Sequence, residues 1–190
     1  MVFEETRLKG AFLVELEKRE DSRGFFARGF CAREFKQHGL TSQMVQANIS
    51  FSRLRGTLRG MHYQIPPATE PKFIRCVRGA IWDVIIDMRP DSPTYLQHIG
   101  VELTAENHRA LFVPDMFAHG HQALTDGVEL FYLVGEFYTP GCERGVRYND
   151  PAIGIQWPLP VTVISDKDAT WPSIEIGASA ANVGGENVPR

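Results

Sequence analysis

Short apolar runs separated by turn-forming residues fill the middle of the chain. Gly, Pro, Asn and Asp stand between these runs, which read FIRCVR (73–78), AIWDVIID (80–87), LQHIGVEL (96–103), ALFVP (110–114) and VELFYLV (128–134). Many short strands at this spacing favour an antiparallel sandwich or barrel over alternating strands and helices. The pattern therefore predicts an all-β fold, with its strands between about residue 45 and residue 165.

A helix is indicated at one place, CAREFKQHG (31–39), where Ala32 and Phe35 are three residues apart and Gly39 is a stop signal. The chain of 190 residues fits one domain. After Pro172 the residues become small and polar, and such a segment buries too little apolar surface to order itself. We expect a single domain over residues 1–177 and a loose tail over 178–190.

Alternation along the predicted strands places polar side chains among apolar ones. In the run 80–87, one face carries Ile81, Asp83, Ile85 and Asp87. A carboxylate among isoleucines either points to solvent or lies in a polar cavity with a partner, because an unpaired buried charge is costly. Lys72 and Tyr132 also share faces with apolar residues, and the three together indicate the lined mouth of a barrel.

Composition excludes several classes of protein. The chain is 43% hydrophobic and 23% charged, and it holds no apolar run near the roughly 18 residues of a membrane span. A net charge of −3 without a basic run argues against a nucleic-acid partner. The first residues, MVFEETRLKG, do not resemble a secretory signal, and the three cysteines form no C-x-x-C pair. We expect a cytoplasmic protein that makes no membrane contact.

The densest set of polar residues lies between positions 46 and 87, and further ordered motifs surround it. They read DSRGFF (21–26), QANIS (46–50), LRGMHYQ (58–64), KFIRCVRGAIWDVIIDMRPDSPTY (72–95), VPDMFAHG (113–120), FYLVGEFYTPGCERG (131–145), YNDPAIGIQWP (148–158) and ISDKD (164–168). In this order they closely resemble the dTDP-4-dehydrorhamnose 3,5-epimerase family, the RmlC type. The resemblance covers nearly the whole chain up to about Pro172.

This resemblance implies a cupin fold, a double-stranded β-helix or jelly-roll barrel with short peripheral helices. It implies an isomerase that needs neither metal nor any other cofactor and acts on a nucleotide-linked 4-keto-6-deoxyhexose in deoxysugar biosynthesis. The natural product would be dTDP-4-dehydro-L-rhamnose, destined for a polysaccharide or a glycosylated metabolite. The family resemblance also implies a homodimer in which the N-terminal segment of each chain completes the partner's site.

The resemblance also implies roles for individual residues. His62 would be the catalytic base, held by Asp168, while Tyr132 would donate a proton on the opposite face and Lys72 would stabilise the enolate oxygen. Asp83 is a possible supporting residue. Substrate-binding roles would fall to Arg23, Phe26, Arg28, Gln46, Ala47, Asn48, Arg59, His119, Tyr138, Glu143 and Lys167. His38, His98 and His108 are expected to be packing or surface residues.

The chemistry of epimerisation requires these residue types. A C–H bond beside a ketone is acidic because the carbanion delocalises onto oxygen, so the enzyme needs a base at carbon and a cation or donor at the oxygen. Inversion also needs a second acid–base group across the ring. A phenol suits that position, especially if a nearby cation lowers its pKa.

Three alternatives remain open at this point. A metal-dependent cupin would use His62, Glu70 and His119, although His62-Tyr63-Gln64 replaces the usual H-x-H pair and amides are poor ligands. A non-catalytic sugar-nucleotide binder would not need opposed acid and base. A single-centre epimerase on another nucleotide sugar would keep the same chemistry. Departures from the family pattern leave the substrate open, and these are Arg28, Glu70 and His121.

Overall fold

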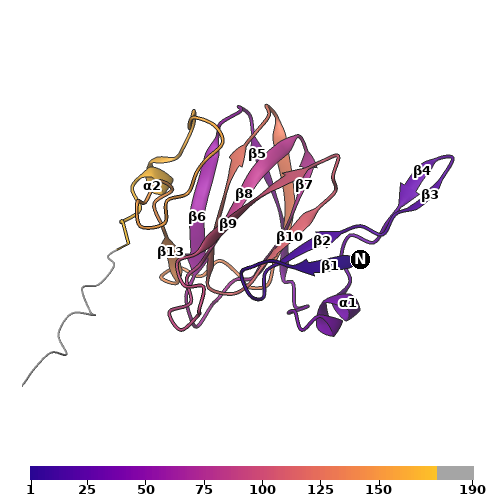
Figure 1. The fold of residues 1–190 in the computed structure, drawn as a ribbon, viewed down its shortest axis with the longest axis horizontal. Coiled ribbons are helices and arrows are strands. Elements are labelled where there is room, and N and C mark those ends of the chain that lie inside the picture. Colours follow the sequence, from indigo (N-terminus) through magenta and orange to yellow (C-terminus); the bar gives the residue numbers. More distant parts are fainter. Residues whose placement is uncertain (175–190) are drawn as a thin grey trace, which may run out of the picture.

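Two antiparallel sheets face each other in the computed structural model, which describes residues 1–174 (Figure 1). The six-stranded sheet runs β1 (Val2–Glu5), β2 (Phe12–Glu15), β10 (Ala110–Val113), β7 (Lys72–Arg78), β12 (Val128–Val134) and β5 (Gln46–Ser52). The five-stranded sheet runs β13 (Glu143–Gly145), β6 (Leu58–Gln64), β11 (Phe117–Ala123), β8 (Ala80–Asp87) and β9 (His98–Thr104). From β5 onward the chain passes repeatedly between the sheets, which is the jelly-roll arrangement of a cupin.

The predicted all-β class and each of the predicted strands are confirmed. The predicted helix is α1 (Ala32–Gln37), and a second short helix, α2 (Asp166–Ala169), follows near the end of the described chain. None of the helices within residues 1–174 combines the length and the apolar character needed to cross a membrane. The predicted tail, 178–190, lies outside the described residues.

The interior between the two sheets is filled by the apolar side chains that alternation places there. Ile81 and Ile85 of β8 pack with Ile74 of β7 and Leu130 of β12 in one buried cluster. The alternate residues of β8, such as Val84, lie on the other face of the sheet in a separate cluster with residues of the segment 146–157. The period-two pattern thus separates the two faces of β8, and because both are buried in apolar clusters the structure is needed to show which one lies between the sheets.

Helix α1 covers part of the outer face of the six-stranded sheet. Its buried Phe35 makes edge-to-face contacts with Phe73 of β7 and Phe112 of β10. Such aromatic pairs add to the stabilisation that comes from burying the rings. The part of this face over β5 and β12 is left uncovered within the described chain, where Ile49, Phe51 and Phe131 are exposed.

The structure adds N-terminal strands that the sequence pattern did not indicate. Strands β1 and β2 extend the six-stranded sheet, and β3 (Arg19–Asp21) pairs with β4 (Gly24–Phe26) in a hairpin that projects away from the barrel (Figure 1). All residues of that hairpin are exposed. Because it packs no face on the core, it lacks the apolar alternation by which strands are detected.

Candidate active site

The site lies between the two sheets, in two adjoining cavities of about 440 Å³ and about 230 Å³. His62, Lys72 and Tyr132 line both of them. His62 comes from the five-stranded sheet, whereas Lys72 and Tyr132 come from the six-stranded sheet. The groups proposed from the sequence as base and as opposite-face donor therefore stand on facing walls of one space.

His62 is held by a carboxylate that is distant in sequence. Its Nε2 lies 2.6 Å from Oδ1 of Asp168, and the other oxygen of Asp168 accepts the backbone N–H of Gly60 at 3.1 Å. Burial alone would raise the pKa of Asp168, but hydrogen bonds from His62, Gly60 and Ser165 outweigh it and lower the pKa. The ionised carboxylate fixes the proton on Nε2, which leaves the lone pair of His62 on Nδ1. The choice of Asp168 over Asp166 is thus the one that this geometry favours.

Two glycines bring the backbones of β6 and β11 together beside this pair. A Cβ built on Gly60 would lie 2.5 Å from Cα of Gly120 and 2.7 Å from the carbonyl oxygen of His119. The φ angle of Gly60 is +121°, a conformation that other residues rarely adopt. This close approach places His62 directly opposite His119 in the sheet.

Lys72 is almost buried and forms an ion pair with Glu70. The sequence indicated Lys72 as a cation for an enolate oxygen and noted Glu70 only as an unusual residue or a potential ligand. The two residues are two positions apart, a spacing that places side chains on one face of an extended chain. Sequence reasoning missed the pair, although that spacing is a signal for it.

Tyr132 is partly buried, and burial is the main reason that its pKa is raised. The charge of Glu70 raises this pKa further, while the guanidinium of Arg59 opposes the shift. The sequence suggested a nearby cation that lowers the pKa of this phenol; Arg59 acts in that direction, but burial and the carboxylate of Glu70 outweigh it, so the net shift of the pKa is upward. A raised pKa keeps the hydroxyl protonated at neutral pH, which is the state that a proton donor requires.

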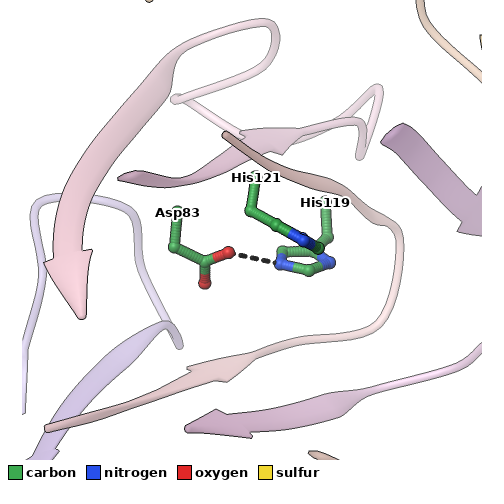
Figure 2. A group of neighbouring side chains, drawn as sticks. All are labelled: Asp83, His119 and His121. Carbon is green, nitrogen blue, oxygen red and sulfur yellow. Dashed lines mark hydrogen bonds and ion pairs between the residues drawn. The ribbon is translucent and has the colours of Figure 1, made fainter. Parts of the chain in front are cut away.

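A second histidine–carboxylate pair lies deeper in the five-stranded sheet. Nε2 of His119 is 2.6 Å from Oδ1 of Asp83, and Asp83 is fully buried (Figure 2). The sequence left open whether Asp83 points to solvent or lies in a cavity with a partner. The structure shows it buried and paired with His119. His121 follows on the same face of β11 and is also buried. Burial is the largest cause that lowers the pKa of His121 to about 3, so its imidazole is neutral.

The rim of the larger cavity contains a connected polar group from the loop after β12, from β13 and from α2. Nζ of Lys167 lies 2.7 Å from both carboxylate oxygens of Glu143, and the hydroxyl of Tyr138 donates to Glu143 at 3.3 Å. Tyr138 and Glu143 line the cavity. The structure thus brings together three residues that the sequence assigned to substrate binding.

Not all of the substrate-binding candidates on β5 and β6 line the cavities. Gln46 and Asn48 line the larger cavity, and Arg59 lines the smaller one while donating to the backbone of Phe51 at 3.0 Å. Ala47 pairs with Leu133 on the strand beside it and lines neither cavity. Its proposed contact with the substrate can then come only from its backbone or from outside the barrel.

The three N-terminal residues expected at the substrate lie away from these cavities. Arg23 pairs with Asp21 on the projecting hairpin, and the side chain of Phe26 is exposed. Arg28 lies 3.3 Å from Glu34 and lines a separate cavity with Phe26. Within one chain, the structure does not bring Arg23, Phe26 and Arg28 to His62.

Residues 1–174 contain one group of three potential metal ligands whose donor atoms lie within 4.8 Å of one another, namely Asp83, His119 and His121. The set considered from the sequence, His62, Glu70 and His119, is not gathered in this way, since Glu70 pairs with Lys72 and His62 with Asp168. The main cavity therefore offers proton-transfer groups: a base held by a carboxylate, an ammonium, and a protonated phenol across from the base.

Comparisons with known proteins agree with this geometry. The sequence profile of a family described as dTDP-4-dehydrorhamnose 3,5-epimerase matches residues 5–175. An enzyme of that name from Methanothermobacter thermautotrophicus is 42% identical over 172 residues, which are 89% of this chain and 92% of the relative. The crystal structure of dTDP-4-dehydrorhamnose 3,5-epimerase from Bacillus anthracis with TDP and PPi bound has a TM-score of 0.87 and 40% identity, with 91% of this chain and 99% of that chain covered.

A relative with a different reaction is also similar. A 3'-monoepimerase from Streptomyces bikiniensis, solved in complex with dTDP-quinovose, has a TM-score of 0.80 and 35% identity, and 88% of this chain and 85% of that chain are covered. The family profile covers most of the chain and several relatives exceed a third identity. This chain belongs to the dTDP-4-dehydrorhamnose 3,5-epimerase family, whose members are isomerases.

Proposed function

We propose that this protein inverts C3 and C5 of dTDP-4-keto-6-deoxyglucose to give dTDP-4-keto-L-rhamnose. The observation that carries the proposal is the position of His62, with Asp168 behind it, across one cavity from Tyr132. The names of the similar proteins support the nucleotide and the sugar. Both carbons flank the 4-keto group, so one base serves both centres.

In this mechanism Nδ1 of His62 removes the proton from carbon, and the electron pair moves to the 4-keto oxygen as an enolate. The ammonium of Lys72 stabilises that oxygen, and its pairing with Glu70 holds it at the cavity wall. The hydroxyl of Tyr132 then delivers a proton to the other face of the ring. Arg59, His119 and the rim group of Tyr138, Glu143 and Lys167 would bind the substrate.

The exposed apolar surface supports a homodimer. The outer face of β5, β7 and β12 carries Ile49, Phe51, Val77 and Phe131, all exposed in the single chain. A contiguous exposed apolar patch of this kind marks an interaction site. We place the second copy here, with its projecting hairpin delivering Arg23 and Phe26 toward the nucleotide of the other chain. Arg28, followed by the partly buried Phe30, would reach the same region.

Incubation with the substrate in deuterium oxide tests the proposed reaction. We expect deuterium at both C3 and C5, because each carbon must exchange its proton with solvent during inversion. NMR of the recovered sugar nucleotide measures both positions. Deuterium at neither carbon would contradict the epimerase proposal.

The same spectrum distinguishes a second candidate function. Two observations favour single-centre inversion as the alternative. The chain is similar to a 3'-monoepimerase, and Glu70 and His121 line the cavities that contain the proposed base and proton donor. Inversion confined to C3 would establish that reaction in place of the double one.

Chelation tests whether the reaction needs a metal. The proposed steps use His62, Lys72 and Tyr132, whose chemistry requires no ion, so we expect full activity after exhaustive dialysis against a strong chelator. Product formation by the dialysed protein, checked for residual metal by mass spectrometry, gives the measurement. Activity that disappears and returns with one divalent ion would overturn this prediction.

A further inference from the structure

Asp83, His119 and His121 converge from two neighbouring strands on the inner side of the five-stranded sheet. His119 and His121 are alternate residues of β11, so both side chains leave the same face, and His121 stands directly opposite Asp83 of β8. Figure 2 shows the His121 ring and the Asp83 carboxylate both extending toward the His119 ring. Their donor atoms all lie within 4.8 Å of one another.

Two of the polar atoms in this group have no hydrogen-bond partner among the described residues. They are Oδ2 of Asp83 and Nε2 of His121, and both are inaccessible to solvent. Asp83 as a whole is 0% exposed and His121 is 5% exposed. Buried polar atoms are normally satisfied, and one without a partner requires an explanation. A ligand bound between these side chains supplies the missing contacts.

We propose that Asp83, His119 and His121 form a binding site for a late first-row transition-metal ion such as Zn²⁺. Two imidazoles and one carboxylate are a common protein ligand set for zinc, with bonds of about 2.0–2.2 Å. Imidazole nitrogen favours such an ion over Mg²⁺ or Ca²⁺, which prefer oxygen ligands only. On binding, the ion takes the position between His119 and Asp83, and the hydrogen on Nε2 of His119 is exchanged through solvent for one on Nδ1, so that a neutral imidazole coordinates the ion.

The smaller cavity adjoins this group. His119 and His121 both line that cavity, which is the side from which an ion and further ligands would reach them. Two cations, Arg59 and Lys72, also line this cavity. Lys72 is paired with Glu70, and the side chain of Arg59 is held by Oγ of Ser52 at 3.3 Å and by the carbonyl oxygen of Phe51 at 3.0 Å.

His121 supplies the third ligand atom of this site, because without it only His119 and Asp83 of the group would remain. The ion would also occupy His119, which the proposed function assigns to substrate binding. Competition between Zn²⁺ and the nucleotide sugar is therefore expected, and this last consequence rests on the proposed function.

Calorimetric titration of the substrate-free protein with ZnCl₂ tests the site without any measurement of activity. We expect one ion per chain in the wild type, and binding weakened by about 100-fold or more in His121→Phe, since loss of an outer-shell partner alone costs about 10–100-fold. The matched control is His98→Phe, which removes a partly buried imidazole from the adjacent strand β9. It should bind as the wild type does.

A second variant and a second probe protect the test against a folding defect. Asp83→Asn keeps the shape of the side chain and removes its charge, and it should also weaken Zn²⁺ binding. Titration with Co²⁺ should give visible absorption bands in the wild type that both site variants lose. Absence of stoichiometric binding in the wild type, or equal affinity in folded His121→Phe and Asp83→Asn proteins, would overturn the proposal whatever the epimerase activity.

Discussion

Replacing His62 by alanine is expected to stop deuterium incorporation at both C3 and C5. The variant lacks the only base that the proposal places at the substrate carbon, and loss of a general base typically costs about 10²–10⁴-fold in rate. The measurement is the initial rate of solvent exchange by NMR under saturating substrate. Because both carbons use the same imidazole, the two rates should fall together.

The control for this variant removes an imidazole from elsewhere in the chain. His98→Ala takes a partly buried histidine from β9, outside both cavities, and should leave exchange unchanged. Circular dichroism of both proteins establishes that they are folded, since His62→Ala leaves the buried Asp168 without one of its donors. A folded His62→Ala protein that exchanges at the wild-type rate would show that another group is the base.

Replacing Tyr132 by phenylalanine should separate exchange from inversion. The ring still packs against the buried cluster between the sheets, and His62 can still remove and return a proton on its own face. Delivery to the opposite face loses its donor, so formation of inverted product should fall by about 10²–10⁴-fold while exchange continues more slowly. Two NMR signals from one incubation, label at carbon and the coupling pattern of the inverted ring, report the two processes.

Tyr95→Phe is the matched control, because it deletes a phenol hydroxyl from an exposed position away from the cavities. It should epimerise normally. If Tyr132→Phe also inverted C5 at the rate of the wild type, the hydroxyl would have no part in proton return and Tyr132 would be a packing residue.

Much of the fold could be predicted from the sequence because its strands lie half against a core. The run 80–87 alternates between two buried clusters, and this alternation predicted the strand and grouped Asp83 with Ile81 and Ile85, while leaving open whether that face is internal. The hairpin β3–β4 escaped prediction, since its residues are exposed and carry no period-two apolar signal. Local pattern detects strands by burial, and an element that packs on nothing in its own chain is invisible to it.

The sequence also predicted the residues of the candidate site better than the contacts between them. The three residues to which the resemblance assigned proton transfer, His62, Tyr132 and Asp168, line one cavity, although Asp168 is 106 positions away from His62. The resemblance did not reveal that Glu70 pairs with Lys72, or that Glu70 raises the pKa of Tyr132. The pair was signalled by the spacing of two positions, whereas the effect of Glu70 on Tyr132 depends on a distance across the folded barrel that residue order does not show.

The proposed base and the proposed proton donor come from different sheets, and this has a consequence for the configuration of the product. A planar enolate has two faces, and in the proposed mechanism one face would turn to the strand that bears His62 and the other to the strand that bears Tyr132. Both side chains line the two adjoining cavities between the sheets, so a ring bound there would have the base on one side and the donor on the other. The positions of the base and the donor on opposite sheets would then determine the direction of inversion. The side chains at the rim would determine only which carbon of the sugar faces these two groups.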